Sequence, residues 1–283
     1  MSPKYVGYQL AQWLSTTLPS HSAFRCAESL ADCQWRWSAA DRRAVQANLA
    51  CLMRQAPTEQ SRSVREVFRN FGRYLVEFFT MHAVAHPEVV VEGGEHLAAI
   101  RHHPRGAIVL TAHLGNWELG AMVLHRMGLS ISAIALQHDD PHMDQLFNRQ
   151  RQRCGIRVIP LGQDAARQGL QWLQGGQLLG VLGDRDFSGN GLMTRFCGRG
   201  VLLPRGPATL SLRAGAPILP VFLIREGCWQ FRLCVEGPVW PPARATGEEA
   251  LRVITEAYAA VIERYVKRFP DQWLMFQPIL GEG

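Results

Sequence analysis

A histidine and a glutamate five residues apart, His113 and Glu118, are the residues of this sequence best suited to chemistry. In one regular helix the two side chains would point about 140° apart, because successive residues turn by about 100°. If His113 instead lies in a turn and a helix begins near Asn116, the carboxylate can reach back to the imidazole. It would then fix the ring tautomer and stabilise the imidazolium, so that the other ring nitrogen could take a proton from an attacking hydroxyl.

Two interpretations of this pair stay open on residue types alone. In the first, the pair works like the base of a serine-histidine-aspartate triad, with the substrate supplying the hydroxyl. In the second, His113 is a core histidine with satisfied hydrogen bonds, and Glu118 caps the helix that follows it.

The elements that must position this pair are typical of an α/β fold. Residues 107–112 form a continuous apolar run, as in a strand buried on both faces, and this strand would place His113 at its carboxyl end. Strand and helix patterns then alternate, which predicts a mostly parallel central sheet with helices on both faces. In such sheets ligands bind beyond the carboxyl ends of the strands.

The remaining elements are expected at regular intervals along the chain. A glycine-rich stretch at residues 183–200 is expected to be a long loop, with Gly-Asn-Gly at 189–191 marking either a mobile loop over the site or a hairpin. The expected strands are residues 88–92, 107–112, 131–136, 157–160, 178–182, 217–224 and 229–236, and the expected helices are residues 116–127, 143–154, 163–174, 204–214 and 247–269.

Residues 1–86 are expected to form an N-terminal helical segment that packs on an α/β core of residues 87–283, both within one structural unit. A helix around residues 6–14 comes first, and a capping box at Ser38 and Asp41 opens the next. The strongest helix begins at Pro57, with its apolar residues on one face and arginines on the other. Either it packs on the core with its basic face in water, or it lies on anionic lipid with its stripe partly inserted. Its apolar residues are Val64, Val67, Phe68, Phe71, Tyr74, Leu75, Phe78 and Phe79, and its arginines are Arg62, Arg65, Arg69 and Arg73.

Length and composition exclude several classes of protein. The chain has 283 residues, 47% hydrophobic and 19% charged, which excludes a disordered or collagen-like chain. The net charge of +6 is modest and no basic-aromatic module is present, so we expect no nucleic-acid binding. The seven cysteines are never at Cys-x-x-Cys spacing, which indicates neither a disulfide framework nor a zinc ribbon. No signal peptide or run of about 18 apolar residues is evident, so we expect a cytoplasmic protein that meets a membrane from its surface.

One cluster of potential metal ligands surrounds Pro141. His138, Asp139, Asp140 and His142 have the right types for a divalent ion. The proline interrupts the helix that ligation by histidines four residues apart would use. We therefore expect no metal site here.

Five blocks of the sequence, in the right order, resemble the motifs of the lysophospholipid acyltransferase superfamily. The closest likeness is to its branch of lipid A lauroyl/myristoyl acyltransferases and mycobacterial phosphatidylinositol mannoside acyltransferases. The first block is the His-x4-Glu motif, His113 to Glu118, and the resemblance covers roughly residues 40–277. The other blocks are the arginine-bearing residues 144–155, Gly-Asp-Arg-Asp at 183–186 with Phe-Cys-Gly-Arg at 196–199, Leu-Pro-Arg-Gly-Pro-Ala at 203–208 with residues 213–221, and Gln272-Trp273.

The resemblance implies acyl transfer from a thioester, on acyl carrier protein or coenzyme A, to a hydroxyl of a lipid or glycolipid. It implies that His113 is the general base and that Glu118 is its partner in a charge relay. The tetrahedral oxyanion would need hydrogen-bond donors, either backbone amides near the helix start or an arginine. No cofactor and no metal are implied, because the thioester is a substrate and these groups cover the chemistry.

Substrate-binding candidates come from the first two blocks. Asn116 lies where the helix after His113 begins. Arg149 and Arg153 are four residues apart on one helix face, where they could clamp a phosphate of the acceptor or of the donor's phosphopantetheine arm. Their alternative is a solvated basic face. Arg151 points further round the helix and is a weaker candidate.

Further binding candidates come from the third and fourth blocks. Asp184 or Asp186 could hold an arginine of the second block in place, and Arg185 could bind phosphate; the alternative is a turn that the aspartates cap. Arg205 and Gly206 lie between two prolines at a helix start, in the region that the resemblance assigns to acceptor binding. A purely structural turn is the alternative.

Two departures from the family pattern bear on the substrate. The membrane-spanning helix with which lipid A enzymes usually begin is missing, which leaves room for a more soluble acceptor held on a carrier protein. The Phe-Pro-Glu-Gly-Thr motif of glycerol-phosphate acyltransferases is also missing, which argues against the phosphatidic acid pathway. We expect an acyltransferase peripheral to the cytoplasmic face of the inner membrane, with a thioesterase and a non-catalytic lipid-binding module as alternatives.

Overall fold

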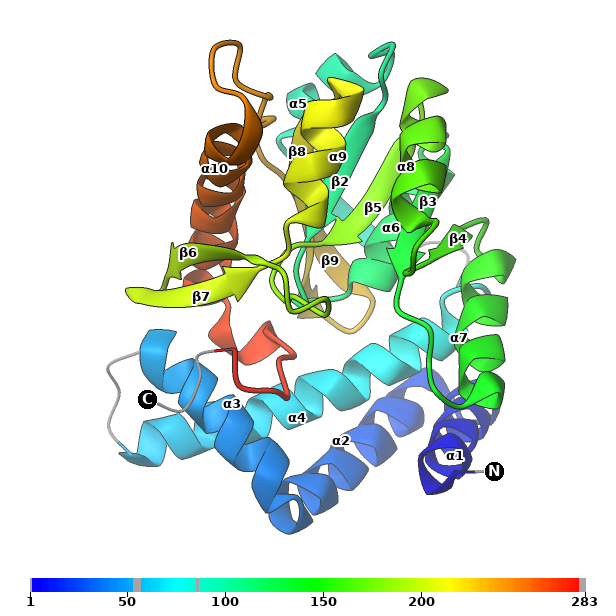
Figure 1. The fold of residues 1–283 in the computed structure, drawn as a ribbon. Helices are drawn as coiled ribbons and strands as arrows, with labels where there is room; N and C mark the ends of the chain where they lie inside the picture. Colours follow the sequence, from blue (N-terminus) through cyan, green and yellow to red (C-terminus); the bar gives the residue numbers. More distant parts are fainter. Residues whose placement is uncertain (1, 53–56, 85–86, 280–283) are drawn as a thin grey trace.

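A seven-stranded sheet forms the centre of the computed structural model, which describes residues 2–52, 57–84 and 87–279 (Figure 1). Within these residues the strand order is β1-β9-β8-β2-β5-β3-β4, and every neighbouring pair is parallel except β8 and β9. The predicted α/β fold with a mostly parallel sheet is therefore confirmed. The strands are β1 (Glu88–Glu92), β2 (Ala107–Thr111), β3 (Ile131–Ala135), β4 (Arg157–Pro160), β5 (Leu178–Leu182), β8 (Ile218–Gly227) and β9 (Gln230–Val235).

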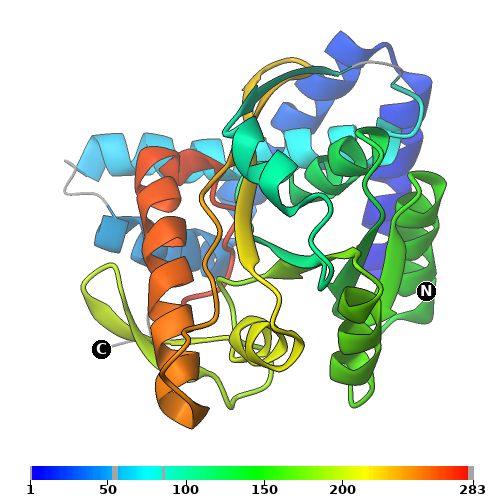
Figure 2. The same ribbon diagram turned by 90° about the horizontal axis from the view of Figure 1, so that it is seen from above.

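Helices cover both faces of the sheet and also form an N-terminal helical segment. Figure 1 shows α8, α9 and α10 in front of the sheet and α1 to α4 gathered below it. In Figures 1 and 2 the C-terminal end of α10 leads into the 3-10 turn η1, which packs beside α4. The helices are α1 (Pro3–Thr17), α2 (Ser20–Trp37), α3 (Ala39–Leu52), α4 (Pro57–Thr80), α5 (Gly94–Ile100), α6 (Trp117–Arg126), α7 (Pro141–Arg153), α8 (Ala165–Gln174), α9 (Gly206–Ala214), α10 (Gly247–Arg268) and η1 (Pro270–Gln272).

The alternation of side chains along β2 divides the apolar core in two. Val109 packs in a cluster that joins α4, α5 and α6 to one face of the sheet. Ile108 and Leu110 point the other way, into a cluster with α8, α9 and α10. Because β2 is buried on both faces, its sequence is a continuous apolar run rather than an alternating one.

The expectation that residues 183–200 form one long loop is wrong in part, because the first strand of a hairpin and the start of its second strand lie within this range. Strands β6 (Leu192–Phe196) and β7 (Arg199–Leu203) pair antiparallel and pack on α10. The turn is formed by Cys197 and Gly198, both with positive φ (52° and 79°), and the Gly-Asn-Gly at 189–191 precedes the hairpin instead of turning it. A cysteine with positive φ is uncommon, so the turn has little sequence signal.

The helix α4 lies in the core and not on a lipid surface. Its residues Val67, Phe68, Phe78 and Phe79 are fully buried. The interpretation that α4 packs on the core is confirmed, but three arginines of its basic face form ion pairs instead of being surrounded only by water. Asp32 of α2 binds two of them, and Glu28 of α2 with Glu66 of α4 binds a third: the contacts are Arg65 Nε–Asp32 Oδ1 (2.7 Å), Arg69 Nη2–Asp32 Oδ2 (2.8 Å), Arg73 Nε–Glu28 Oε1 (2.7 Å) and Arg73 Nη1–Glu66 Oε1 (2.5 Å).

Acidification is expected to weaken the contact between α2 and α4 at Asp32. Hydrogen bonds from Arg65 and Arg69 hold the pKa of Asp32 well below its usual range. The folded-state pKa is therefore below that of the unfolded chain, so this carboxylate stabilises the fold above about pH 4 and its contribution is lost as the pH falls further. We expect Asp32→Asn to lower the free energy of unfolding by about 1 kcal/mol at neutral pH, with a difference that shrinks below about pH 4. Urea denaturation of the parent and the variant at neutral pH and below about pH 4 measures this difference in the free energy of unfolding. A difference that does not change with pH would contradict the prediction.

A buried network of charged and amide side chains ties α4 to the sheet. Glu77 of α4 binds Arg225 of β8 through two hydrogen bonds, at 2.5 Å from Nε and 2.6 Å from Nη2. Asn70 of α4 accepts a further bond from Arg225 (3.1 Å) and donates to the carbonyl of Asp271 in η1 (2.8 Å). The N-terminal helices and the α/β core thus share both an apolar cluster and a polar one.

No helix in the part of the chain that the structure describes has the length and apolar character to cross a bilayer.

Candidate active site

His113 lies just beyond β2, at the carboxyl end of the sheet, as the sequence predicts. Its carbonyl accepts a hydrogen bond from the amide of Leu274 (2.7 Å), and the neighbouring Leu114 pairs with Trp273 in an isolated antiparallel bridge. The segment after η1 therefore holds the turn that carries His113. The imidazole side chain remains 17% exposed, so part of the ring is accessible to a bound molecule.

The carboxylate that binds this imidazole belongs to Asp184. The Nδ1 atom of His113 lies 2.9 Å from Oδ1 of Asp184, and the backbone amide of His113 donates to Oδ2 (2.8 Å). The indole Nε1 of Trp273 also donates to Oδ2 (3.0 Å). Asp184 is completely buried, and these contacts fix its position relative to the ring.

The register between β2 and β5 explains why His113 and Asp184 meet. Thr111 pairs with Leu182 where the two parallel strands end. His113 and Asp184 each lie two residues further along the chain. Equivalent positions beyond neighbouring parallel strands lie side by side at the same edge of the sheet.

Asp184 remains ionised despite its burial. Burial raises the pKa of a carboxyl, but the charge of His113 and hydrogen bonds from His113 and Trp273 more than offset this, so the pKa of Asp184 is lowered. An ionised carboxylate at Nδ1 favours the tautomer that carries its proton there. The Nε2 atom is then free to accept a proton from another molecule.

Glu118 pairs with Arg151 of α7, and this corrects the expected contact between Glu118 and His113. Arg151 donates to the carboxylate through Nε (3.0 and 3.1 Å) and Nη2 (2.6 Å), and both side chains are nearly buried. The ring beside the imidazole is instead that of Trp117, with a centroid distance of 5.2 Å. Residues 117 and 118 point about 100° apart in α6, so only one of them can face His113.

Asn116 is part of the framework around the site. It caps α6, its Oδ1 accepting from the amide of Leu119 (3.0 Å), and its Nδ2 donates to Glu77 (2.7 Å). It is completely buried. The expected substrate contact of Asn116 is therefore corrected, because both ends of its amide already bind the protein.

Arg149 and Arg153 lie on the exposed face of α7, away from the His113–Asp184 pair. Each is two residues from Arg151, which places it about 200° around the helix from the side that reaches α6. The weaker candidate, Arg151, is thus the arginine of this helix that faces the first block. Neither Arg149 nor Arg153 is held by an aspartate of the third block, which corrects that expectation, since Asp184 binds His113.

The loop after Asp184 is organised by Asp186. Its carboxylate accepts hydrogen bonds from the amide and hydroxyl of Ser188 (3.1 and 2.6 Å) and from the amide of Gly191 (3.0 Å). Asp186 therefore acts as the turn-capping residue of the alternative interpretation. Arg185 lies over the ring of Phe187 at 4.2 Å and forms no ion pair within the described residues, so its charge is available to a ligand.

The fourth block forms the start of α9. Arg205 pairs with Glu248 in the first turn of α10. Gly206 is exposed, and a Cβ atom built there would meet nothing within 4 Å, so no neighbouring backbone requires a glycine at this position. Arg205 is half-buried.

The cluster around Pro141 performs a structural role. Asp140 caps α7, accepting from the amide of His142 (3.0 Å), and also binds the hydroxyl of Ser2 (2.6 Å). Across residues 2–52, 57–84 and 87–279, no group of three or more histidine, cysteine, aspartate or glutamate side chains is arranged to hold a metal ion.

Comparison with known proteins identifies the family to which the chain belongs. The sequence model of the family described as bacterial lipid A biosynthesis acyltransferase matches residues 4–280. The chain belongs to this family.

Similar members of this acyltransferase family come from two groups of bacteria. The phosphatidylinositol mannoside acyltransferase of Mycobacterium tuberculosis (strain ATCC 25618 / H37Rv) is 27% identical over 74% of this chain and 67% of its own. That of Mycolicibacterium smegmatis is 26% identical over 82% of this chain and 77% of its own. The lipid A biosynthesis palmitoleoyltransferase of Escherichia coli K12 is 25% identical, over 79% and 73% respectively.

The sequence patterns alone do not assign a role to two residues of this candidate site, Trp273 and Arg151. Trp273 was noted only as part of a closing motif, yet its indole fixes Asp184. Arg151 lies four residues after the buried Phe147 and next to the buried Gln150, and this burial pattern marks the inner face of α7. That periodicity was the signal that could have identified Arg151.

Proposed function

We propose that this member of the family transfers a fatty acyl group from an acyl thioester to a hydroxyl of a lipid or glycolipid, with His113 as general base and Asp184 as its partner. The observation that carries the proposal is the hydrogen-bonded His113–Asp184 pair at the carboxyl edge of the sheet. The relatives described above, a phosphatidylinositol mannoside acyltransferase and a lipid A biosynthesis palmitoleoyltransferase, support a glycolipid acceptor.

In the proposed reaction Nε2 of His113 removes the proton from the acceptor hydroxyl as its oxygen attacks the thioester carbonyl. The imidazolium that forms is stabilised by the ionised Asp184. The tetrahedral intermediate then expels the thiolate, which takes the proton from the imidazolium. The products are an ester and a free thiol, and the base returns to its starting state.

The oxyanion of the intermediate needs donors that the protein has not already used. The amides of Gly115 and Asn116 bind the carbonyls of Gln272 (3.0 Å) and Leu223 (2.9 Å), so these two amides are not free. We propose that Arg185, whose charge has no ion-pair partner in the described chain, stabilises the oxyanion or a phosphate of the donor.

We propose that the donor is carried by acyl carrier protein or coenzyme A, and that the protein contacts the cytoplasmic face of the inner membrane peripherally. Both carriers hold the acyl group on the terminal thiol of a phosphopantetheine arm, so His113 and Asp184 would meet the same thioester. No further cofactor is needed for this reaction.

The stoichiometry of products tests the proposal. Purified protein incubated with acyl-coenzyme A or acyl-carrier-protein and a detergent-dispersed phosphatidylinositol mannoside or lipid A precursor is expected to give one acylated lipid for each thiol released. Thiol release is followed with a thiol reagent and the lipid by mass spectrometry. Free fatty acid at the rate of thiol release, with acceptor present, would indicate a thioesterase instead.

A further inference from the structure

The outer face of α1 carries an apolar stripe, the α1 stripe, that no other described residue covers. It consists of Val6, Leu10 and Trp13, which are 52%, 50% and 59% exposed. Their steps of four and three residues confine them to about 60° of the helix surface. Tyr8 and Ala11 lie on the opposite side and pack against the core. Single exposed apolar side chains are ordinary, but three on one helix face form a patch that marks an interaction site.

The positive charges beside the α1 stripe come from the neighbouring helix α7. Lys4 of α1 lies on the side of Tyr8 and Ala11, away from the stripe. The helix α1 contains no carboxylate. The carboxylate that contacts it, Asp140, already accepts from the hydroxyl (2.6 Å) and amide (3.3 Å) of Ser2. On the adjacent α7, Arg149 and Arg153 are exposed and form no ion pair in the part of the chain described.

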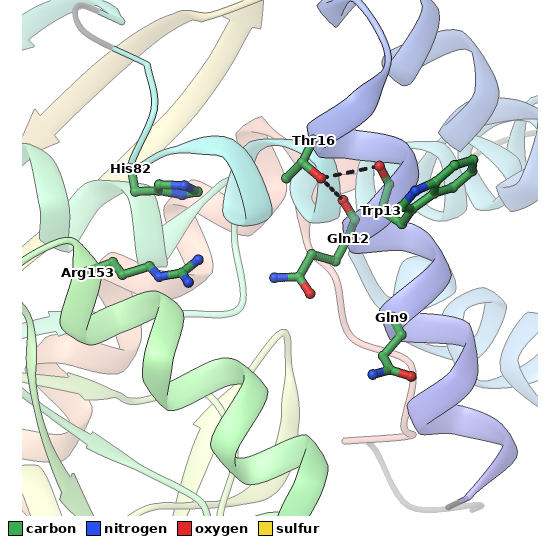
Figure 3. Close-up of a pocket in the computed structure, with 6 residues that line it drawn as sticks. All are labelled: Gln9, Gln12, Trp13, Thr16, His82 and Arg153. Atoms are coloured by element: carbon green, nitrogen blue, oxygen red, sulfur yellow. Dashed lines mark hydrogen bonds between the residues drawn. The ribbon is translucent and has the colours of Figure 1, made fainter.

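A cavity of about 460 Å³ lies beside the stripe, between α1, α7 and the turn after α4. Figure 3 shows Gln12 of α1 and Arg153 of α7 extending toward each other, while the indole of Trp13 points away on the far side of α1. The side chains that border this α1–α7 cavity are polar apart from the indole. They are Gln9, Gln12, Trp13, Thr16, His82 and Arg153.

We propose that the outer face of α1 is the surface that docks on an anionic lipid bilayer. The α1 stripe enters the interface between headgroups and acyl chains, and Arg153, with the amides of Gln9 and Gln12, binds a headgroup phosphate in the α1–α7 cavity. This specifies the membrane contact of the proposed function and rests on it only for the identity of the acceptor.

A helix with an apolar stripe and cationic surroundings lies in the plane of the bilayer surface, held by buried apolar area and by attraction to anionic lipid. Tryptophan suits this depth, because its ring is apolar and its N–H is polar. The apolar face of α4 cannot serve in this way because it is buried in the core.

Vesicle sedimentation with the full chain tests the proposal. The parent protein is expected to sediment with vesicles of phosphatidylcholine and phosphatidylglycerol, and more weakly with phosphatidylcholine alone. The variant Leu10→Ser/Trp13→Ser is expected to lower the partition coefficient at least about tenfold on both kinds of vesicle. Trp37→Ser is the matched control, because Trp37 is 84% exposed at the end of α2, outside the stripe.

The phosphate contact has a separate test. Arg153→Gln is expected to lower binding to the phosphatidylglycerol vesicles about fivefold and to leave binding to phosphatidylcholine unchanged. Arg167→Gln on α8, which removes an exposed charge from a surface ion pair with Asp164, is the control and should bind like the parent.

Two results would overturn the proposal. One is equal vesicle binding by the parent and by Leu10→Ser/Trp13→Ser. The other is a dimer of the parent in light scattering that the same variant abolishes, since the stripe would then be covered by a second copy of this chain. Acyl transfer to detergent-dispersed acceptor is assayed on the same samples. It should be equal in parent and variant, and its absence from both would contradict the proposed function but not the docking surface.

Discussion

Replacing Asp184 with asparagine is expected to lower kcat about 10⁴-fold, the loss that the equivalent change causes in a serine-histidine-aspartate triad. The side chain keeps its size, but an amide cannot accept from the His113 amide, the Trp273 indole and the imidazole as the carboxylate does. The imidazole then loses the partner that holds its proton on Nδ1. Because binding of the acyl thioester does not depend on that proton, KM should change little.

The control for this variant is Asp164→Asn, which makes the same change at an exposed position in the turn that precedes α8. Circular dichroism should show that both variants are folded. His113→Ala and the double variant His113→Ala/Asp184→Asn should be about as slow as Asp184→Asn alone, because residues that act as one unit give non-additive losses. If Asp184→Asn kept a tenth or more of the parent's kcat, the assigned pair would be wrong.

Replacing Glu118 with leucine is expected to lower the free energy of unfolding by about 3–5 kcal/mol. The change leaves the charge of Arg151 nearly buried without its partner, and uncompensated buried charges are costly. Burial lowers the pKa of Arg151, and Glu118 reverses this so that the pKa is raised, which shows how closely the arginine's charge depends on the glutamate. Urea denaturation of parent and variant measures the loss.

The double variant Glu118→Leu/Arg151→Met separates the ion pair from other causes. It removes both charges and keeps most of the volume, so it should recover much of the stability that Glu118→Leu loses. Glu28→Ala is the surface control: its partner Arg73 is more exposed, and a loss of about 1 kcal/mol or less is expected. A Glu118→Leu protein as stable as the parent would refute the buried pair.

The sequence predicts the position of His113 but not its partner. An apolar run that ends at residue 112 is sufficient to place the histidine at the edge of the sheet. The strands follow each other in the chain as β2, β3, β4, β5, yet in the sheet β5 lies next to β2 and β3 lies beyond it. That crossover brings Asp184 to the imidazole, and it depends on packing between distant segments, which local periodicity does not record.

The choice between Glu118 and Asp184 shows the same limit at the level of side chains. Spacing shows that Glu118 can approach His113, but Trp117 and Glu118 compete for the side of α6 that faces the imidazole. The outcome is set by Arg151 of α7, which binds the carboxylate from the opposite side. The sequence patterns predict no separate helix at residues 20–37, where the structure has α2. Its Asp32 binds two arginines of α4, so the surroundings of these arginines could not be predicted either.

The contacts of residues 272–274 have a consequence for synthesis. The carbonyl of Gln272 accepts from Gly115, Trp273 donates to Asp184, and Leu274 donates to His113. A nascent polypeptide on the ribosome therefore lacks these three supports until residue 274 has been translated. A shortened product that ends before Gln272 should fail to hold His113 beside Asp184, so the geometry of this pair forms only after the segment from Gln272 to Leu274 has been added.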